Sequence, residues 1–248
     1  MSSEVALPRP VATAIIATLI GVAAAAWLVT AQQAASMAAM GGMAMVGGGL
    51  FLGTWVVMTV AMMFPAVAPI VLTHAGVVRS RGEATMGTVV LVVGYLVVWT
   101  AAGLVLLGVI QLLGSSIAAP VESWLPRLGG AIVVLAGIYQ LTPLNNACLR
   151  ACRSPLGFIL SHDFGVGTSA AARTGLLHGL ECVGSCGALM AVLAVLGLMN
   201  LALMAVVAVV FLLEKTWRNG IMLSHVAGAA SVILGLTVII RPDILHLL

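Results

Sequence analysis

Long apolar runs, each about as long as a membrane is thick, dominate this chain. Of its 248 residues, 62% are hydrophobic and only 7% are charged, whereas a soluble domain carries about a quarter charged residues. A helix of about 20 apolar residues crosses the hydrocarbon layer, and the helix itself satisfies its backbone polar groups there. We therefore expect an all-α protein, a polytopic transmembrane helical bundle that lies in the lipid bilayer.

The apolar runs predict about seven spans within a single integral membrane domain that covers residues 1–248. A division at Gly197 separates the fifth span from the sixth, and one long helix there would lower the count by one. The first run is longer than the core of a typical signal peptide, so we interpret it as a retained anchor. The expected spans are residues 11–31, 50–73, 87–113, 126–144, 168–196, 199–213 and 221–240.

Positive charge in the loops predicts the orientation, because lysine and arginine are enriched in cytoplasmic loops. Alternate loops carry this charge, and Arg9 before the first span agrees with them. We expect a cytoplasmic N-terminus and a C-terminus on the opposite side. No basic cluster is dense enough to indicate nucleic acid as a partner. The residues that define the pattern are Arg79, Arg81, Arg150, Arg153, Arg173, Lys215 and Arg218.

The four cysteines form two C-x-x-x-C pairs. The first pair is Cys148 with Cys152, and the second is Cys182 with Cys186. On a helix this spacing places the two members one turn apart on the same side. Thiols are ligands of Cu(I) and Zn(II), but cysteine is also a well-tolerated packing residue in apolar interiors. Both interpretations are open.

Steps of four residues extend the second pair into a ladder of soft ligands. His178 lies four residues before Cys182, and Met190 lies four residues after Cys186. Successive members are therefore about 6 Å apart along one helix face. An imidazole, two thiols and a thioether form a ligand set for Cu(I), with Zn(II) as the alternative. We expect this ladder and the first cysteine pair to hold the metal.

Methionines are concentrated in the first loop, residues 36–46, which faces the outside in the expected orientation. Thioethers bind soft cations, and the glycines and alanines between them leave the segment adaptable. Met58 and Met62 continue the series one turn apart in the second span. We interpret these methionines as a metal entry path, while the alternative is that they fill gaps between helices. The loop methionines are Met37, Met40, Met43 and Met45.

Acidic residues within spans are costly and are functional hypotheses by default. Glu181 lies inside the fifth span next to Cys182, and Glu214 lies at the end of the sixth. We expect both to act beside the metal ligands as charge or hydrogen-bond partners. The alternatives are a protonated Glu181 that hydrogen bonds inside the bundle and a surface ion pair between Glu214 and Lys215.

Several motifs occur together in the order found in a known family. The chain resembles, over about residues 50–220, a bacterial family of predicted metal-binding integral membrane proteins, domain of unknown function 2182. The resemblance implies a multi-helix protein of the bacterial inner (plasma) membrane whose cysteines are metal ligands. The motifs are W-x-x-M-x-x-A-M-M-x-P (residues 55–65), Y-Q-L-T-P-L-x-x-x-C-L-x-x-C-R-x-P (residues 139–155), H-G-x-x-C-x-G-x-C-x-x-L-M (residues 178–190) and G-x-M-N-L (residues 197–201) with Glu214-Lys215.

The sequence departs from the family pattern within the cysteine segments. Ser185 stands where family members usually carry a further cysteine, and Gly187 stands in place of a tryptophan. Asn145 replaces the usual lysine. The additional thiol that the family pattern would supply is therefore missing.

The leading hypothesis is a membrane protein that binds a soft metal ion, copper first and zinc second, for transport or delivery. Outer methionines would collect the ion and the ladder would hold it. Cys148 and Cys152 would then pass it to the cytosol, where a soluble metallochaperone could accept it. Export and delivery to a membrane copper enzyme are equally compatible with the sequence.

Two other functions remain open. A membrane thiol–disulfide oxidoreductase would pass electrons between the pairs, although an i,i+4 pair on one helix is awkwardly oriented for a disulfide. A non-catalytic subunit or assembly factor of a larger membrane complex would use the thiols only for packing. The number of metal sites is open too, because one four-thiol site requires residues 145–158 to fold back into the bundle.

Overall fold

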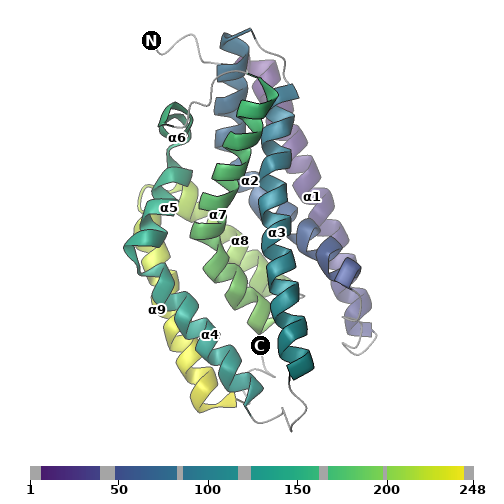
Figure 1. Ribbon diagram of the computed structural model, residues 1–248, viewed down its shortest axis with the longest axis vertical. Helices are drawn as coiled ribbons and strands as arrows, with labels where there is room; N and C mark the ends of the chain where they lie inside the picture. Colours follow the sequence, from purple (N-terminus) through teal and green to yellow (C-terminus); the bar gives the residue numbers. More distant parts are fainter. Residues whose placement is uncertain are drawn as a thin grey trace.

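The computed structural model describes residues 7–39, 48–82, 86–116, 124–161, 167–197 and 200–242. Every regular element in these ranges is a helix, which confirms the all-α fold (Figure 1). The helices are α1 (Arg9–Ala39), α2 (Gly48–Ser80), α3 (Met86–Ser116), α4 (Leu125–Gln140), α5 (Pro143–Arg153), α6 (Pro155–Ser161), α7 (Thr168–Leu196), α8 (Leu201–Thr216) and α9 (Gly220–Ile240).

Four helices form the long part of the bundle. α1, α2, α3 and α7 contain 31, 33, 31 and 29 residues. At 1.5 Å per residue they are about 43–50 Å long, which exceeds the hydrocarbon core of about 30 Å. Figure 1 shows that α1 begins, α2 ends, and α3 and α7 begin at the same end of the bundle. α4, α8 and α9 lie nearer the opposite end of the bundle.

Five helices in the described part of the chain are long and apolar enough to cross a membrane, namely α1, α2, α3, α7 and α9. The bent pair of α4 and α5 adds a sixth if it counts as one span. The expected number was about seven. α8 accounts for the difference, because its 16 residues are fewer than the length of about 20 that a span needs. The apolar helices are compatible with a membrane protein.

α7 and α8 are separate helices joined by a short connection. α7 ends at Leu196, and Gly197 has a φ of 121°, a left-handed conformation that favours glycine. The side chain of Asn200 then caps α8 by accepting a hydrogen bond from the Leu203 amide at 3.0 Å. The helix therefore breaks at the position where the sequence analysis divided the fifth and sixth spans.

α4 and α5 meet at a bend of 64°. Thr142 caps α5, because its hydroxyl accepts a hydrogen bond from the Asn145 amide at 3.3 Å. Pro143 follows at the first helical position, which suits proline, and its missing N–H cannot continue α4. The expected span of residues 126–144 thus ends as α4 at Gln140. α5 instead packs against α7.

α4 and α9 form a close pair on one side of the bundle (Figure 1). A Cβ atom added to Gly137 would lie 2.6 Å from the carbonyl oxygen of Gly228. A Cβ added to Gly235 would lie equally close to the carbonyl oxygen of Gly130, at 2.6 Å. Glycines on both helices therefore let the two backbones touch. This pair fixes the end of α4 from which α5 begins.

The C-terminal end of α5 is tied to the turn between α8 and α9. The guanidinium of Arg153 donates to the carbonyl oxygen of Glu214 and, at 3.1 Å, to that of Arg218. A Cβ on Gly220 would collide with the Arg153 guanidinium and with the Glu214 carbonyl. Glycine at this position therefore allows the contact. The tie holds Cys152, the neighbour of Arg153, against the interior of the bundle.

Candidate metal centre

Three of the four thiols meet in one buried cluster, formed by Cys152 of α5 with Cys182 and Cys186 of α7. The Cys182 thiol interacts with both of the others. The hydroxyl oxygen of Ser185 lies 3.7 Å from Cys152 Sγ and 3.6 Å from Cys186 Sγ. Cys182 and Cys186 are completely buried, and Cys152 nearly so. We call these three residues the thiol cluster.

Lys215 closes the thiol cluster from α8. Its Nζ donates a hydrogen bond to Cys182 Sγ at 2.9 Å. Cys182 lies as many residues before the end of α7 as Lys215 lies after the start of α8, so the two helices bring them to the same level. The prediction of an ion pair at the surface between Glu214 and Lys215 is wrong, because these side chains are only 0% and 8% exposed.

Tyr95 supplies the second polar contact of Cys182. Its hydroxyl group lies 3.2 Å from Cys182 Sγ, and the side chain enters from α3 almost completely buried. An ammonium and a phenol hydroxyl are both able to donate to an anionic sulfur, and such charge-assisted hydrogen bonds are the stronger kind. The surroundings of Cys182 are therefore suited to a thiolate.

His178 lies one turn before Cys182 on the same buried face of α7. Its ring is packed between Tyr95, at a centroid distance of 5.9 Å, and Phe158, at 5.3 Å. Its Nδ1 atom is buried and has no hydrogen-bond partner among the described residues. A buried nitrogen without a partner costs free energy, and a soft metal ion is one partner that would satisfy it.

The remaining member of the ladder and the methionines of α2 are also buried. Met190 lies one turn beyond Cys186 and, like Met58 and Met62, is at most 2% exposed. All of them belong to the same hydrophobic core as the thiol cluster. Burial in this core is compatible with ligands and with packing alike, so the roles of these methionines stay predictions.

Cys148 lies outside the thiol cluster. It is half-buried, and its Sγ atom packs against the backbone of α7 at Gly184, where an added Cβ would come within 2.6 Å of it. The Tyr139 hydroxyl donates to the Gly184 carbonyl at 2.8 Å beside this contact. Cys148 is close enough to Glu181 for the charge of the carboxylate to act on the thiol.

The two acidic residues occupy different surroundings. Glu181 is half-buried on α7 and lies on the side of Cys148. Glu214 is fully buried in the last turn of α8, where the charge of Lys215 acts on its carboxylate. The predicted role of both residues, as charge or hydrogen-bond partners of the metal ligands, stays a prediction.

The methionine loop falls largely outside the described residues. Met40, Met43 and Met45 belong to the undescribed range 40–47, and Met37 lies in the last turn of α1. The entry path through this loop therefore stays a prediction.

The donor chemistry of the thiol cluster fits a soft monovalent ion. Within the described ranges, no three histidine, cysteine or acidic side chains stand in the arrangement of a preformed metal site. Three thiols and the partnerless nitrogen of His178 are, however, the ligand types that select Cu(I). Side-chain rotation is needed to close such a site, because Lys215 and Tyr95 now hold the sulfur of Cys182.

Comparison with known families identifies the class of protein. The model of the PpoB2 family, described as a copper chaperone, matches residues 52–238. The chain belongs to this family. The match covers most of the chain and includes the whole thiol cluster with Tyr95, His178 and Lys215. It confirms the expected association with copper and a copper-related role. No curated protein and no solved structure matches the chain.

Sequence reasoning did not place Lys215, Tyr95 and Ser185 in the site. The signal that could have identified Lys215 is compositional, because it is the only lysine in a chain with nine arginines. Ser185 did carry a signal, because it stands where the resembled family usually has a further cysteine. Tyr95 gave none, since a tyrosine in an apolar helix is compatible with ordinary packing.

Proposed function

We propose that this protein is an integral membrane copper chaperone that binds Cu(I) at the thiols of Cys152, Cys182 and Cys186. The observation that carries the proposal is that separate helices bring three thiols together in one water-excluded cluster. Thiolate ligands select Cu(I). Zn(II) is the weaker alternative, because structural zinc sites almost always have four protein ligands and Ser185 occupies the place where a fourth thiol would stand.

Delivery is supported by the position of Cys148. It lies one turn from Cys152 on α5 and is half-buried, whereas the cluster itself is closed to solvent. Copper would pass from the cluster to Cys148 and then to a partner, either a soluble metallochaperone or a neighbouring membrane subunit. Thiol-to-thiol transfer keeps the ion bound to soft ligands throughout.

The direction of delivery follows from the proposed orientation. With the N-terminus in the cytoplasm and the chain in the inner membrane, Cys148 lies towards the cytoplasmic side, near Arg150 and Arg153. Single cysteines introduced by Met40→Cys and Ser80→Cys in a cysteine-free background test this orientation. An impermeant thiol reagent should label them from opposite sides of the membrane, and labelling from one side contradicts the proposed topology.

Met190, Met58 and Met62 support a route to the cluster from the other side. They lie in the same core, and thioethers bind Cu(I) without the charge of a thiolate. In this proposal the methionines pass the ion inward and the thiol cluster retains it.

Copper content of the full-length protein in lipid nanodiscs tests the proposal. Wild-type protein loaded anaerobically with Cu(I) and desalted should retain the metal in a fixed ratio to protein by mass spectrometry. Cys182→Ser and Cys186→Ser should each lose it, whereas Cys148→Ser is the matched control that keeps the ion but transfers it more slowly. Full copper occupancy in the Cys182→Ser, Cys186→Ser double variant would show that the cluster is not the binding site.

A thiol–disulfide oxidoreductase is the second candidate. Cys152 and Cys182 interact from two different helices, so the poor geometry of an i,i+4 pair does not apply to them. Oxidation to a disulfide would release two protons and two electrons to an acceptor such as a quinone. Metal-free protein in which these two cysteines titrate as a reversible disulfide would favour this function over copper binding.

A further inference from the structure

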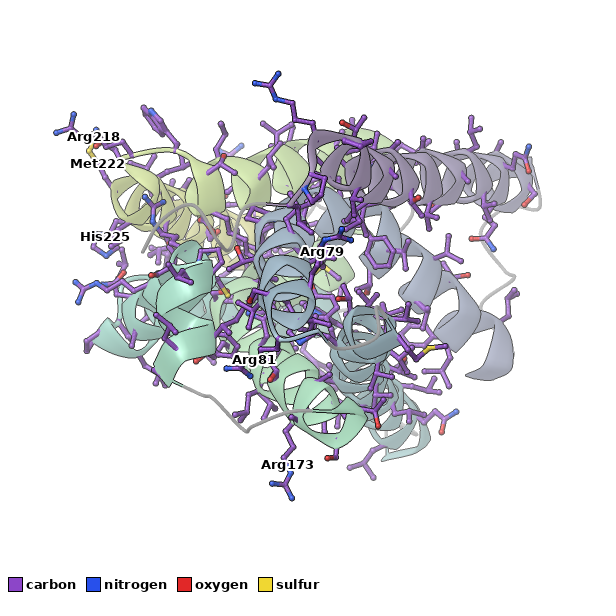
Figure 2. All side chains as sticks on the ribbon, turned by 90° about the horizontal axis from the view of Figure 1, so that it is seen from above. Arg79, Arg81, Arg173, Arg218, Met222 and His225 are labelled. Carbon is purple, nitrogen blue, oxygen red and sulfur yellow. The ribbon has the colours of Figure 1, made fainter. Side chains whose placement is uncertain are left out.

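The single lysine of the chain lies against the thiol cluster. The other nine residues among the lysines and arginines are all arginines. Eight of them are exposed, and the half-buried Arg153 donates to backbone carbonyl groups. Figure 2 shows Arg173 and Arg218 pointing outward from different sides of the bundle, and both are exposed. Lys215 is 8% exposed. Lys215 is thus buried, and its ammonium is directed at a thiol.

A buried ammonium needs an anionic partner, because taking an unpaired charge out of water costs several kcal/mol. The ammonium of Lys215 donates a hydrogen bond to the sulfur of Cys182 at 2.9 Å. Tyr95 approaches the same sulfur from α3. A lysine ammonium is a compact charge on a flexible stem, so it can leave this sulfur without a movement of the helix.

We propose that Lys215 is a tethered counter-cation of the copper site. Its ammonium neutralises Cys182 while the site is empty, is displaced when Cu(I) binds, and returns as the ion leaves. This inference rests on the proposed function. At Cys182 one positive charge replaces another, and a copper–sulfur bond replaces an N–H···S hydrogen bond. The thiols of Cys152 and Cys186 release their protons to solvent as they bind the ion, and no electron is transferred.

Glu214 provides the second resting place for the ammonium. It is the neighbour of Lys215 in the last turn of α8, it is fully buried, and the charge of Lys215 already acts on its carboxylate. A displaced ammonium that turns from Cys182 towards Glu214 remains paired inside the protein. The exchange therefore leaves neither the thiolate nor the ammonium unpaired at any stage.

The exchange predicts an effect on copper release. When Cu(I) departs from a buried thiolate, the returning ammonium compensates the sulfur, and a neutral side chain cannot do so. Lys215→Leu, which adds no metal ligand, should slow release to an excess of a chromogenic Cu(I) chelator by about tenfold or more, equivalent to about 1.4 kcal/mol of activation free energy. Lys215→Arg keeps the charge and should release copper faster than Lys215→Leu.

Met204→Leu is the matched control for these rates. Met204 lies on the same buried face of α8 and carries no charge, so its replacement should leave release at the wild-type rate. Release from Lys215→Leu at the wild-type rate overturns the inference. If Lys215→Leu does not fold, the measurement on wild-type protein described next decides the question alone.

Displacement can be observed directly because the chain has one lysine. Full-length wild-type protein labelled with nitrogen-15 in lysine gives one side-chain ammonium signal by nuclear magnetic resonance. Stoichiometric Cu(I) should shift this signal, and Cys182→Ser should show no such shift on the same addition. An unchanged signal in copper-loaded wild-type protein overturns the counter-cation role alone. Wild-type protein that retains no copper overturns the proposed function as well.

Discussion

Replacement of Gly184 by alanine should weaken copper binding by pushing α5 away from α7. Gly184 lies between the two cysteines of α7, at the contact with Cys148. A new Cβ would lie 2.6 Å from Cys148 Sγ and 3.3 Å from Cys148 Cβ. Non-bonded heavy atoms are about 3.5–4.0 Å apart at their optimum. Rotation of the thiol relieves the contact with Sγ but not the one with Cβ, so α5 must retreat by a few tenths of an ångström.

The size of the effect follows from the cost of overpacking, about 1–3 kcal/mol. Cys152 lies one turn from Cys148 on the same short helix, so a displacement of α5 also moves Cys152 away from Cys182 and Cys186. If the full cost falls on the copper-bound form, the dissociation constant of Cu(I) rises by about 5- to 150-fold.

Competition with a Cu(I) chelator, with the protein in lipid nanodiscs, measures this change. Gly187→Ala is the matched control, since it lies on the same helix and its added Cβ would meet only Val183 Cγ1 at 3.5 Å, an ordinary contact. The control should bind copper as the wild type does. Equal affinities for Gly184→Ala, Gly187→Ala and wild type would show that the contact of α5 with α7 does not hold the site together.

Three other substitutions test separate parts of the structure. Ser185→Cys places a fourth thiol between two existing ones and should give stoichiometric Zn(II) retention that the wild type lacks, as measured by elemental analysis. Arg153→Ala removes hydrogen bonds from a charged donor, worth about 1.5–3 kcal/mol each, so it should lower the thermal unfolding midpoint, and an unchanged midpoint would contradict the tie between α5 and the α8–α9 turn. Glu181→Gln should change the alkylation rate of Cys148 while copper occupancy stays at the wild-type level, and loss of copper would instead place Glu181 at the cluster.

The helices were predictable because their causes are local. An apolar run of sufficient length forms a helix in the membrane whether or not it packs against other helices. Gly197, with its positive φ, ends α7 after Leu196, the last residue of the expected fifth span. The inward face of α7 was predictable too, since His178, Cys182, Cys186 and Met190 recur at the helical period and are all buried. Here the sequence pattern and the packing agree.

The position of α5 was not predictable from local signals. Pro143 indicates a helix boundary, but it does not indicate which way the chain turns afterwards. The direction depends on Arg153 and the carbonyl groups of the α8–α9 turn, which lie about sixty residues later in the chain. Lys215 was misplaced for a related reason. The charge of a lysine at a helix end indicates a loop, and only the α7–α8 hairpin shows that this lysine is level with Cys182.

The arrangement of the thiols differs from both alternatives that the sequence left open. In the structure Cys152 joins the cluster while Cys148, one turn away on the same helix, packs beside Gly184 at the edge of it. In the proposed function, an ion that leaves the cluster for Cys148 passes between thiols one turn apart on α5. With the ammonium of Lys215 available to compensate the sulfur left behind, the proposed binding and release of copper require only side-chain movements.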